Sequence, residues 1–161
     1  MKKITVVFIV LFASALMGCD YKASRENSPS QIAQNQATII LNCFKTGETE
    51  ELKSLFCDQV KSTHDLDKEL NEAINFITGD IVNDGTWIGM SEGGKSIDNG
   101  IVTKLDIHPS IVDMETTNGN KYSIFFDTYL IYSENPQNIG MTYIILSTAN
   151  DEEIMIGEII Y

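Results

Sequence analysis

Two carboxylates that stand on rows of apolar residues have the clearest potential for chemistry in this sequence. Asp127 alternates with Phe125 and Tyr129 in one expected strand, and Glu158 lies between isoleucines in another. A carboxyl group in apolar surroundings has a raised pKa and can serve as a general acid or base, with a tyrosine such as Tyr129 as hydrogen-bond donor. The simpler interpretation is partial exposure, or a bond to a neighbouring lysine or hydroxyl, because structural networks also perturb carboxylates.

Burial of either carboxylate has a physical requirement that can be tested. An isolated buried charge costs several kcal/mol, so a buried carboxylate must be protonated or hydrogen-bonded. We therefore expect Asp127 or Glu158 to be mostly buried and to accept a hydrogen bond from a tyrosine, serine or threonine hydroxyl.

The two histidines and the acidic residues show no arrangement typical of a catalytic or metal site. His108 precedes Pro109 at the end of an expected strand and His64 lies beside an expected helix start, and neither has a nucleophile nearby in the sequence. The three cysteines form no C-x-x-C pair, and the aspartates lack the spacing of a calcium loop. We expect both histidines at the surface, and we assign no catalytic residue, no metal and no cofactor.

The charge balance excludes one large class of partner. The 161 residues include 11 Lys+Arg against 23 Asp+Glu, which gives a formal net charge of −12, and Arg25 is the single arginine. A nucleic-acid binder needs clustered basic residues to neutralise phosphates, so we expect no nucleic-acid partner. The length fits a single domain.

The N-terminus indicates export and attachment to a membrane. Residues 1–18 have a charged start and a short apolar run that is too short to span a bilayer, and Leu16-Met17-Gly18-Cys19 resembles the lipobox of bacterial lipoproteins. We expect a signal peptide over 1–18, lipidation of Cys19, a flexible tether over 19–27 and one folded domain over 28–161. The alternative is an ordinary secretory signal with an incidental cysteine.

Cys43 and Cys57 remain as thiols after lipidation. An exported location permits a disulfide between them. We favour two buried free thiols, because consecutive helices need not bring these two turns together and cysteine packs well as a small apolar residue.

The hydrophobic period changes from helical to extended after Gly79, which predicts helices first and strands afterwards. We expect an α+β fold in which three N-terminal helices, starting near Pro29, Glu50 and Asp65, pack on a strongly curved antiparallel sheet. Asn118-Gly119 predicts a type I′ hairpin turn between two long strands. The expected strands lie within 80–90 and at about 102–117, 121–132, 140–148 and 153–160, with a glycine-rich loop at 91–100.

Several segments together resemble a known family of bacterial lipoproteins. They are the lipobox, the helix start at Asp65, the glycine-rich stretch 91–97, the strand that ends at His108-Pro109, and Asn135-Pro136. On these residues the chain resembles domain-of-unknown-function (DUF) family 5104. The resemblance implies the cone-shaped, cystatin-like fold of nuclear transport factor two, with a pocket between helices and sheet. It implies no established activity and no catalytic residue.

Three functions follow from these observations. The first is a membrane-anchored, extracytoplasmic, non-enzymatic domain that binds a small molecule, a peptide or an envelope partner in a helix–sheet pocket. The second is an enzyme of the isomerase, dehydratase or hydrolase type that uses a pocket carboxylate, Asp127 or Glu158, and a tyrosine such as Tyr129. The third is an accessory subunit of an envelope assembly. A closed cavity with a carboxylate near a tyrosine would favour the enzyme, and a filled interior would favour binding.

Overall fold

The computed structural model describes residues 28–161, apart from the side chains of residues 90–92. The expected signal peptide, the lipidation site Cys19 and the tether therefore lie outside the described residues. Within the described part, no helix is both long enough and apolar enough to cross a membrane.

Helices occupy the first part of the described chain, as the sequence predicts, but there are four of them among residues 28–161 and not three. They are α1 (Pro29–Thr46), α2 (Glu50–Leu55), α3 (Asp58–Thr63) and α4 (Leu66–Phe76). The Ser28 side chain accepts from the Gln31 N–H at the start of α1, and Gly47 ends this helix at φ 77°. The Asp65 side chain caps α4.

The extra helix is α3, which the sequence pattern did not predict and which two non-helical residues, Phe56 and Cys57, separate from α2. Phe56 adopts an extended conformation, pairs with Met141 in an isolated parallel bridge, and leaves Cys57 to donate its N–H to the Met141 carbonyl. This pairing ends α2 at Leu55, and the chain then turns into α3. Thr49, which precedes α2, makes no side-chain cap hydrogen bond.

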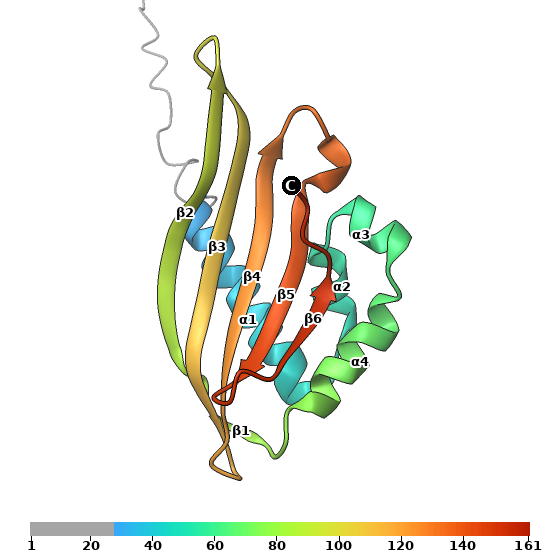
Figure 1. The fold of residues 1–161 in the computed structure, drawn as a ribbon, viewed down its shortest axis with the longest axis vertical. Helices are drawn as coiled ribbons and strands as arrows, with labels where there is room; N and C mark the ends of the chain where they lie inside the picture. Colours follow the sequence, from blue (N-terminus) through green and yellow to red (C-terminus); the bar gives the residue numbers. More distant parts are fainter. Residues whose placement is uncertain (1–27) are drawn as a thin grey trace, which may run out of the picture.

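The strands form one antiparallel sheet (Figure 1). They are β1 (Ile81–Asn83), β2 (Thr86–Asp98), β3 (Ile101–Thr116), β4 (Lys121–Tyr132), β5 (Gly140–Thr148) and β6 (Glu153–Gly157), with a short 3-10 helix η1 (Pro136–Asn138) before β5. The order is β1-β3-β4-β5-β6, and β2 also pairs with β3. The combination confirms the α+β class.

The segment 91–100 is not the loop that its glycines suggested. β2 runs through Gly93 and Gly94 to Asp98 and pairs with β3, with register shifts around these glycines. The turn to β3 is Asn99-Gly100, at φ 49° and 81°, between the paired residues Asp98 and Ile101. Two consecutive positive φ angles are those of a type I′ turn, so a long hairpin forms where a loop was expected.

The hairpin between β3 and β4 lies where the sequence places it, but its turn has another form. Thr116 donates its N–H to the Asn120 carbonyl, and Gly119 donates to the Thr116 carbonyl. Only Gly119 of the expected pair has a positive φ, 75°. The loop therefore holds three residues and is not a two-residue type I′ turn. Asp113, at φ 58°, sits in a further register shift between Ile111 and Met114.

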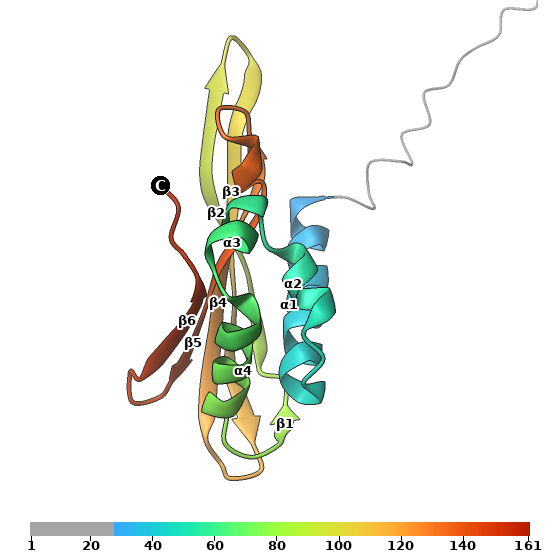
Figure 2. The ribbon, with the colours of Figure 1, turned by 90° about the vertical axis from the view of Figure 1, so that its right-hand side faces the viewer.

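The helices cover one face of the sheet. Figure 1 looks onto the face that carries no helix, with α1 behind the strands. Figure 2 shows the sheet from its edge, with α1 and α2 on one side of it, and α4 packs near β6. Side chains from both layers form the core, and the largest of those that are fully buried are Phe56, Phe126, Ile40, Leu52, Leu70, Ile107, Met114, Ile124, Met141, Ile144, Leu146 and Ile156. Cys43 and Cys57 are buried free thiols.

The last strand is shorter than expected. β6 ends at Gly157, which has φ 77°, and not at residue 160. This left-handed residue breaks the alternation on which the apolar row of Glu158 was based. Ile154 and Ile156 face the core, whereas Glu158 belongs to the C-terminal segment that follows the sheet.

Candidate functional site

The helix-free face of the sheet carries a cluster of polar side chains from β3 and β4. In β4, Phe126 belongs to the core and Thr128 donates its hydroxyl to Gln36 of α1, so Asp127 between them points to the opposite face. In β3, Ile107 is buried, and Asp106 and His108 flank it on the other face.

Asp106, His108 and Asp127 are in direct contact. His108 Nε2 lies 2.9 Å from Asp106 Oδ2, and His108 Nδ1 lies 2.8 Å from Asp127 Oδ1. The Thr142 hydroxyl of β5 donates to Asp127 Oδ2 at 2.9 Å. Both carboxylates are buried, whereas the His108 side chain is 42% exposed, so the imidazole forms the accessible part of the cluster.

The expectation that Asp127 or Glu158 is buried and bonded to a hydroxyl is met by Asp127, through Thr142. Burial raises the pKa of Asp127 above its usual 3.8, and the Thr142 hydrogen bond and the attraction of His108 oppose that rise.

Asp106 and Asp127 each have a buried Oδ1 that makes no hydrogen bond, but Asp127 Oδ1 lies 2.8 Å from His108 Nδ1, so Asp106 has the less satisfied carboxylate. Its Oδ2 faces His108, but its buried Oδ1 has no hydrogen-bond partner. Two glycines of β2 approach this side chain closely: a Cβ atom at Gly93 would lie 2.5 Å from Asp106 Oδ2, and one at Gly94 would lie 3.0 Å from Oδ1. Glycine at these two positions therefore allows the close approach of β2 to the carboxylate, which a side chain would prevent.

Tyr129 lies near the cluster, but its hydroxyl does not donate to Asp127, as the hypothesis of a catalytic carboxylate with a tyrosine donor requires. Its hydroxyl donates to the Ile160 carbonyl at 2.8 Å, in the C-terminal segment, and Tyr132 donates to the Tyr161 carbonyl. The Lys104 ammonium lies 4.9 Å from the ring centroids of both tyrosines. These tyrosines therefore hold the C-terminal segment against the helix-free face.

Glu158 lies apart from Asp127, at the junction of α3 and α4. Its carboxylate is 3.8 Å from His64 Nε2, and His64 Nδ1 is 2.7 Å from Glu69 Oε1. Glu69 Oε2 also accepts the Gly157 N–H at 2.8 Å. Glu158 is partly exposed, so the expectation of an apolar setting for it is wrong. His64 is part-buried in this contact.

Sequence reasoning missed His108 as a partner of Asp127. The available signal was Asp106-Ile107-His108, which places an aspartate and a histidine on one face of a strand. The register that pairs Ile107 with Thr128 and Ser110 with Phe125 then sets His108 beside Asp127.

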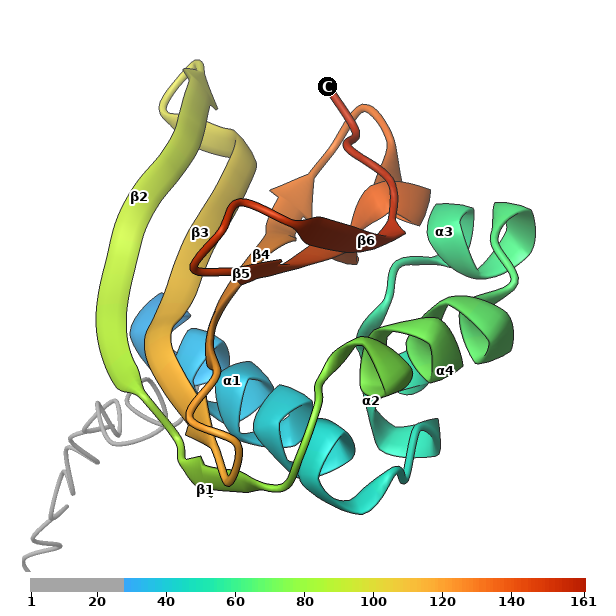
Figure 3. The same ribbon diagram turned by 60° about the horizontal axis from the view of Figure 1, so that its bottom comes forward.

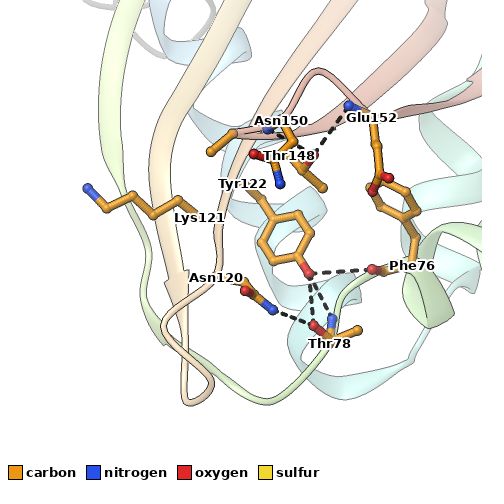
Figure 4. Close-up of a pocket in the computed structure, with 9 residues that line it drawn as sticks. Phe76, Thr78, Asn120, Lys121, Tyr122, Thr148, Asn150 and Glu152 are labelled. Atoms are coloured by element: carbon orange, nitrogen blue, oxygen red, sulfur yellow. Dashed lines mark hydrogen bonds between the residues drawn. The ribbon is translucent and has the colours of Figure 1, made fainter.

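A separate hollow lies at the other end of the sheet (Figure 4). It measures about 270 Å³ and lies between the end of α4 and the turns next to β4 and β5. The Tyr122 hydroxyl accepts the Thr78 N–H at 3.0 Å, and Asn120 donates to the Thr78 hydroxyl at 2.7 Å. These polar groups bond to one another and hold the segment after α4 on the sheet. They are therefore not available as hydrogen-bond partners for a ligand in the hollow.

The chain matches a family described as "Domain of unknown function (DUF5104)" over residues 39–149. Because this match covers more than half of the sequence, the protein belongs to that family, as the resemblance noted from the sequence predicted. No curated protein matches the chain.

Proposed function

We propose that the protein is a lipid-anchored, extracytoplasmic domain that binds an envelope protein or peptide through the helix-free face of its sheet. The observation that carries this proposal is the cluster of Asp106, His108 and Asp127 on that face, where two buried carboxylates hold one exposed imidazole. A polar group that is both exposed and fixed by buried partners is suited to recognition.

An apolar row lies next to the cluster on the same face. Phe125 pairs with Ile145, and Ile145 pairs with Met155, across β4, β5 and β6. The ends of this row are open to solvent, with Phe125 43% and Met155 45% exposed. Exposed apolar side chains beside fixed charges are typical of protein-binding surfaces.

The site chemistry favours binding over catalysis. Both nitrogens of His108 face carboxylates, so neither is directed at a substrate proton, and the Tyr129 hydroxyl is engaged by the Ile160 carbonyl. The space between helices and sheet, where a ligand pocket was expected, contains fully buried side chains such as Phe56 and Phe126. This arrangement supports the helix-free face as the binding surface, in place of a helix–sheet pocket.

The arrangement of elements also supports a fold of the nuclear-transport-factor-two, or cystatin-like, kind. In such a fold N-terminal helices precede an antiparallel sheet and pack on one of its faces, and α1 to α4 precede and cover the sheet in this way (Figure 3). We propose this likeness as the architecture that leaves one sheet face available for a partner.

Anchoring is tested at Cys19. We expect the wild-type protein to sediment with membranes, with a chain that starts at Cys19 and carries acyl mass, because Leu16-Met17-Gly18-Cys19 resembles a lipobox. Cys19→Ala should abolish the acyl mass and accumulate unprocessed precursor. Mass spectrometry of membrane extracts decides, with Cys43→Ala as the control that keeps the modification. An unmodified N-terminus before residue 19 in mature, membrane-bound protein would contradict anchoring.

The binding face is tested by photo-crosslinking in intact cells. A photoreactive phenylalanine analogue in place of Phe125 should give one discrete adduct, because this side chain is exposed on the helix-free face. The same analogue in place of Ile97, which is also exposed but lies near the tip of the β2–β3 hairpin, is the matched control. The adduct should disappear with Asp127→Asn in the same chain. Equal adducts from both positions, or none from position 125, would contradict this face as the partner surface.

A further inference from the structure

We propose that Asp106 and His108 bind a divalent transition-metal ion of the Zn²⁺ class, with Asp127 as the positioning residue of the histidine. This inference rests on the proposed function in one respect: both use the cluster of Asp106, His108 and Asp127. One ligand atom from each of the three side chains lies within 4.8 Å of the others, and this is the one such group of histidine, cysteine and acidic residues in the described part of the chain.

The distances fit a metal ligand pair. His108 Nε2 and Asp106 Oδ2 lie 2.9 Å apart. Two ligands that each lie about 2.0–2.1 Å from one zinc ion are slightly farther apart than this, so a small movement of the exposed imidazole admits the ion. Zn²⁺ binds the lone pair of Nε2 in the neutral ring, whose proton stays on Nδ1 beside Asp127.

An independent observation at Asp106 also indicates a cation. Asp106 is more than nine-tenths buried, yet its Oδ1 has no hydrogen-bond partner. A buried carboxylate oxygen without a donor is costly, and a cation bound at the same carboxylate would satisfy it. Glycine at positions 93 and 94 keeps side-chain atoms of β2 away from the carboxylate oxygens, because a Cβ atom there would lie 2.5 Å from Oδ2 or 3.0 Å from Oδ1.

Asp127 supplies the second feature expected of a metal-bound histidine. Metal-ligating histidines generally donate the other ring N–H to a carboxylate, which fixes the ring and raises its basicity. His108 Nδ1 lies 2.8 Å from Asp127 Oδ1, and Thr142 holds the other oxygen of that carboxylate. Asp127 thus orients Nε2 toward Asp106.

The ligand types select the class of ion. Imidazole with carboxylate suits Zn²⁺ and neighbouring transition metals, whereas Mg²⁺ and Ca²⁺ prefer oxygen ligands alone. Two protein ligands leave positions open for water or for a group from a partner. The buried thiols are poor competing ligands, because burial raises the pKa of Cys43 to about 11 and also raises that of Cys57.

The test is calorimetric titration of the full chain, purified in detergent and freed of metal, with Zn²⁺ and separately with Mg²⁺. We expect one Zn²⁺ per chain and no saturable Mg²⁺ binding. His108→Gln and Asp106→Asn should each weaken Zn²⁺ binding at least about tenfold, and Asp127→Asn should weaken it about 10- to 100-fold as a residue that acts through the ligand. His64→Gln is the matched control, because His64 also contacts two carboxylates, and it should leave Zn²⁺ affinity unchanged.

Folding of each variant is checked by thermal unfolding without metal, and Asp106→Asn and His108→Gln serve as independent tests if one of them unfolds. Wild-type protein without saturable Zn²⁺ binding would overturn the proposal and leave the cluster as a histidine bridged between two carboxylates. The same conclusion follows if binding survives His108→Gln but is lost with His64→Gln. Either result leaves the crosslinking and lipidation experiments, which use no metal, to judge the proposed function separately.

Discussion

Replacing Gly157 with alanine is expected to lower the free energy of unfolding by more than about 4 kcal/mol, an effect that is exceptional for a single substitution. Gly157 ends β6 at φ 77°, and a Cβ atom there would lie 2.3 Å from the Thr142 carbonyl oxygen. That oxygen accepts the Glu158 N–H, so it cannot move away without breaking the pairing of β5 with the C-terminal segment.

Gly47 provides a matched control for this prediction. It has the same φ, 77°, but a Cβ atom there would meet nothing within 4 Å. Gly47→Ala should therefore cost only the strain of a left-handed alanine, about 1–2 kcal/mol. Urea unfolding of the two variants measures the difference directly. Equal losses would show that backbone conformation alone, and not the close approach to Thr142, makes glycine necessary at position 157.

The periodicity of the sequence predicted the elements well where packing is local. Four expected elements match the structure within a few residues: the helix from Pro29 to before Gly47 and the strands near 102–117, 121–132 and 140–148. The errors occur where distant residues decide. The pairing of Phe56 with Met141 ends α2 ahead of a helix, α3, that was not expected, and pairing with β3 makes a strand of a glycine-rich stretch. Neither partner lies within the sequence window on which a local pattern depends.

The candidate site was only half predictable for a related reason. Alternation separated Asp127 from the core row of β4, but the register of β4 on β3 depends on the turn and on bulges. A two-residue turn at Asn118-Gly119 would set Asp127 opposite Ser110. The three-residue loop and the shift near Asp113 move the register by two positions and bring His108 beside Asp127. A bulge of this kind leaves no clear periodic signal.

Replacing Thr142 with valine is expected to destabilise the protein by about 2 kcal/mol near neutral pH in the presence of a chelator, because a hydrogen bond to a charged group is worth about 1.5–3 kcal/mol. Thr142 is fully buried, and its hydroxyl donates to Asp127 Oδ2 at 2.9 Å. Valine has nearly the same shape, so the loss comes from the missing donor. Thr116→Val is the matched control, because the Thr116 hydroxyl is also buried but has no partner. This control should change stability by less than about 0.5 kcal/mol or increase it.

The pH dependence distinguishes the loss of this hydrogen bond from a packing defect. Burial holds the pKa of Asp127 above 3.8 in the folded protein, and the Thr142 hydrogen bond lowers it, so Thr142→Val should raise it further. The folded protein then binds more protons than the unfolded chain above pH 3.8, and the free energy of unfolding falls as pH rises through the folded pKa. The cost of Thr142→Val should accordingly be full above the folded pKa of Asp127 and shrink as this carboxyl group is protonated at lower pH. Urea unfolding of both threonine variants between pH 4 and 8 measures this pH dependence. A cost for Thr142→Val that stays constant across the range would assign it to packing, because a packing defect does not depend on the protonation of Asp127.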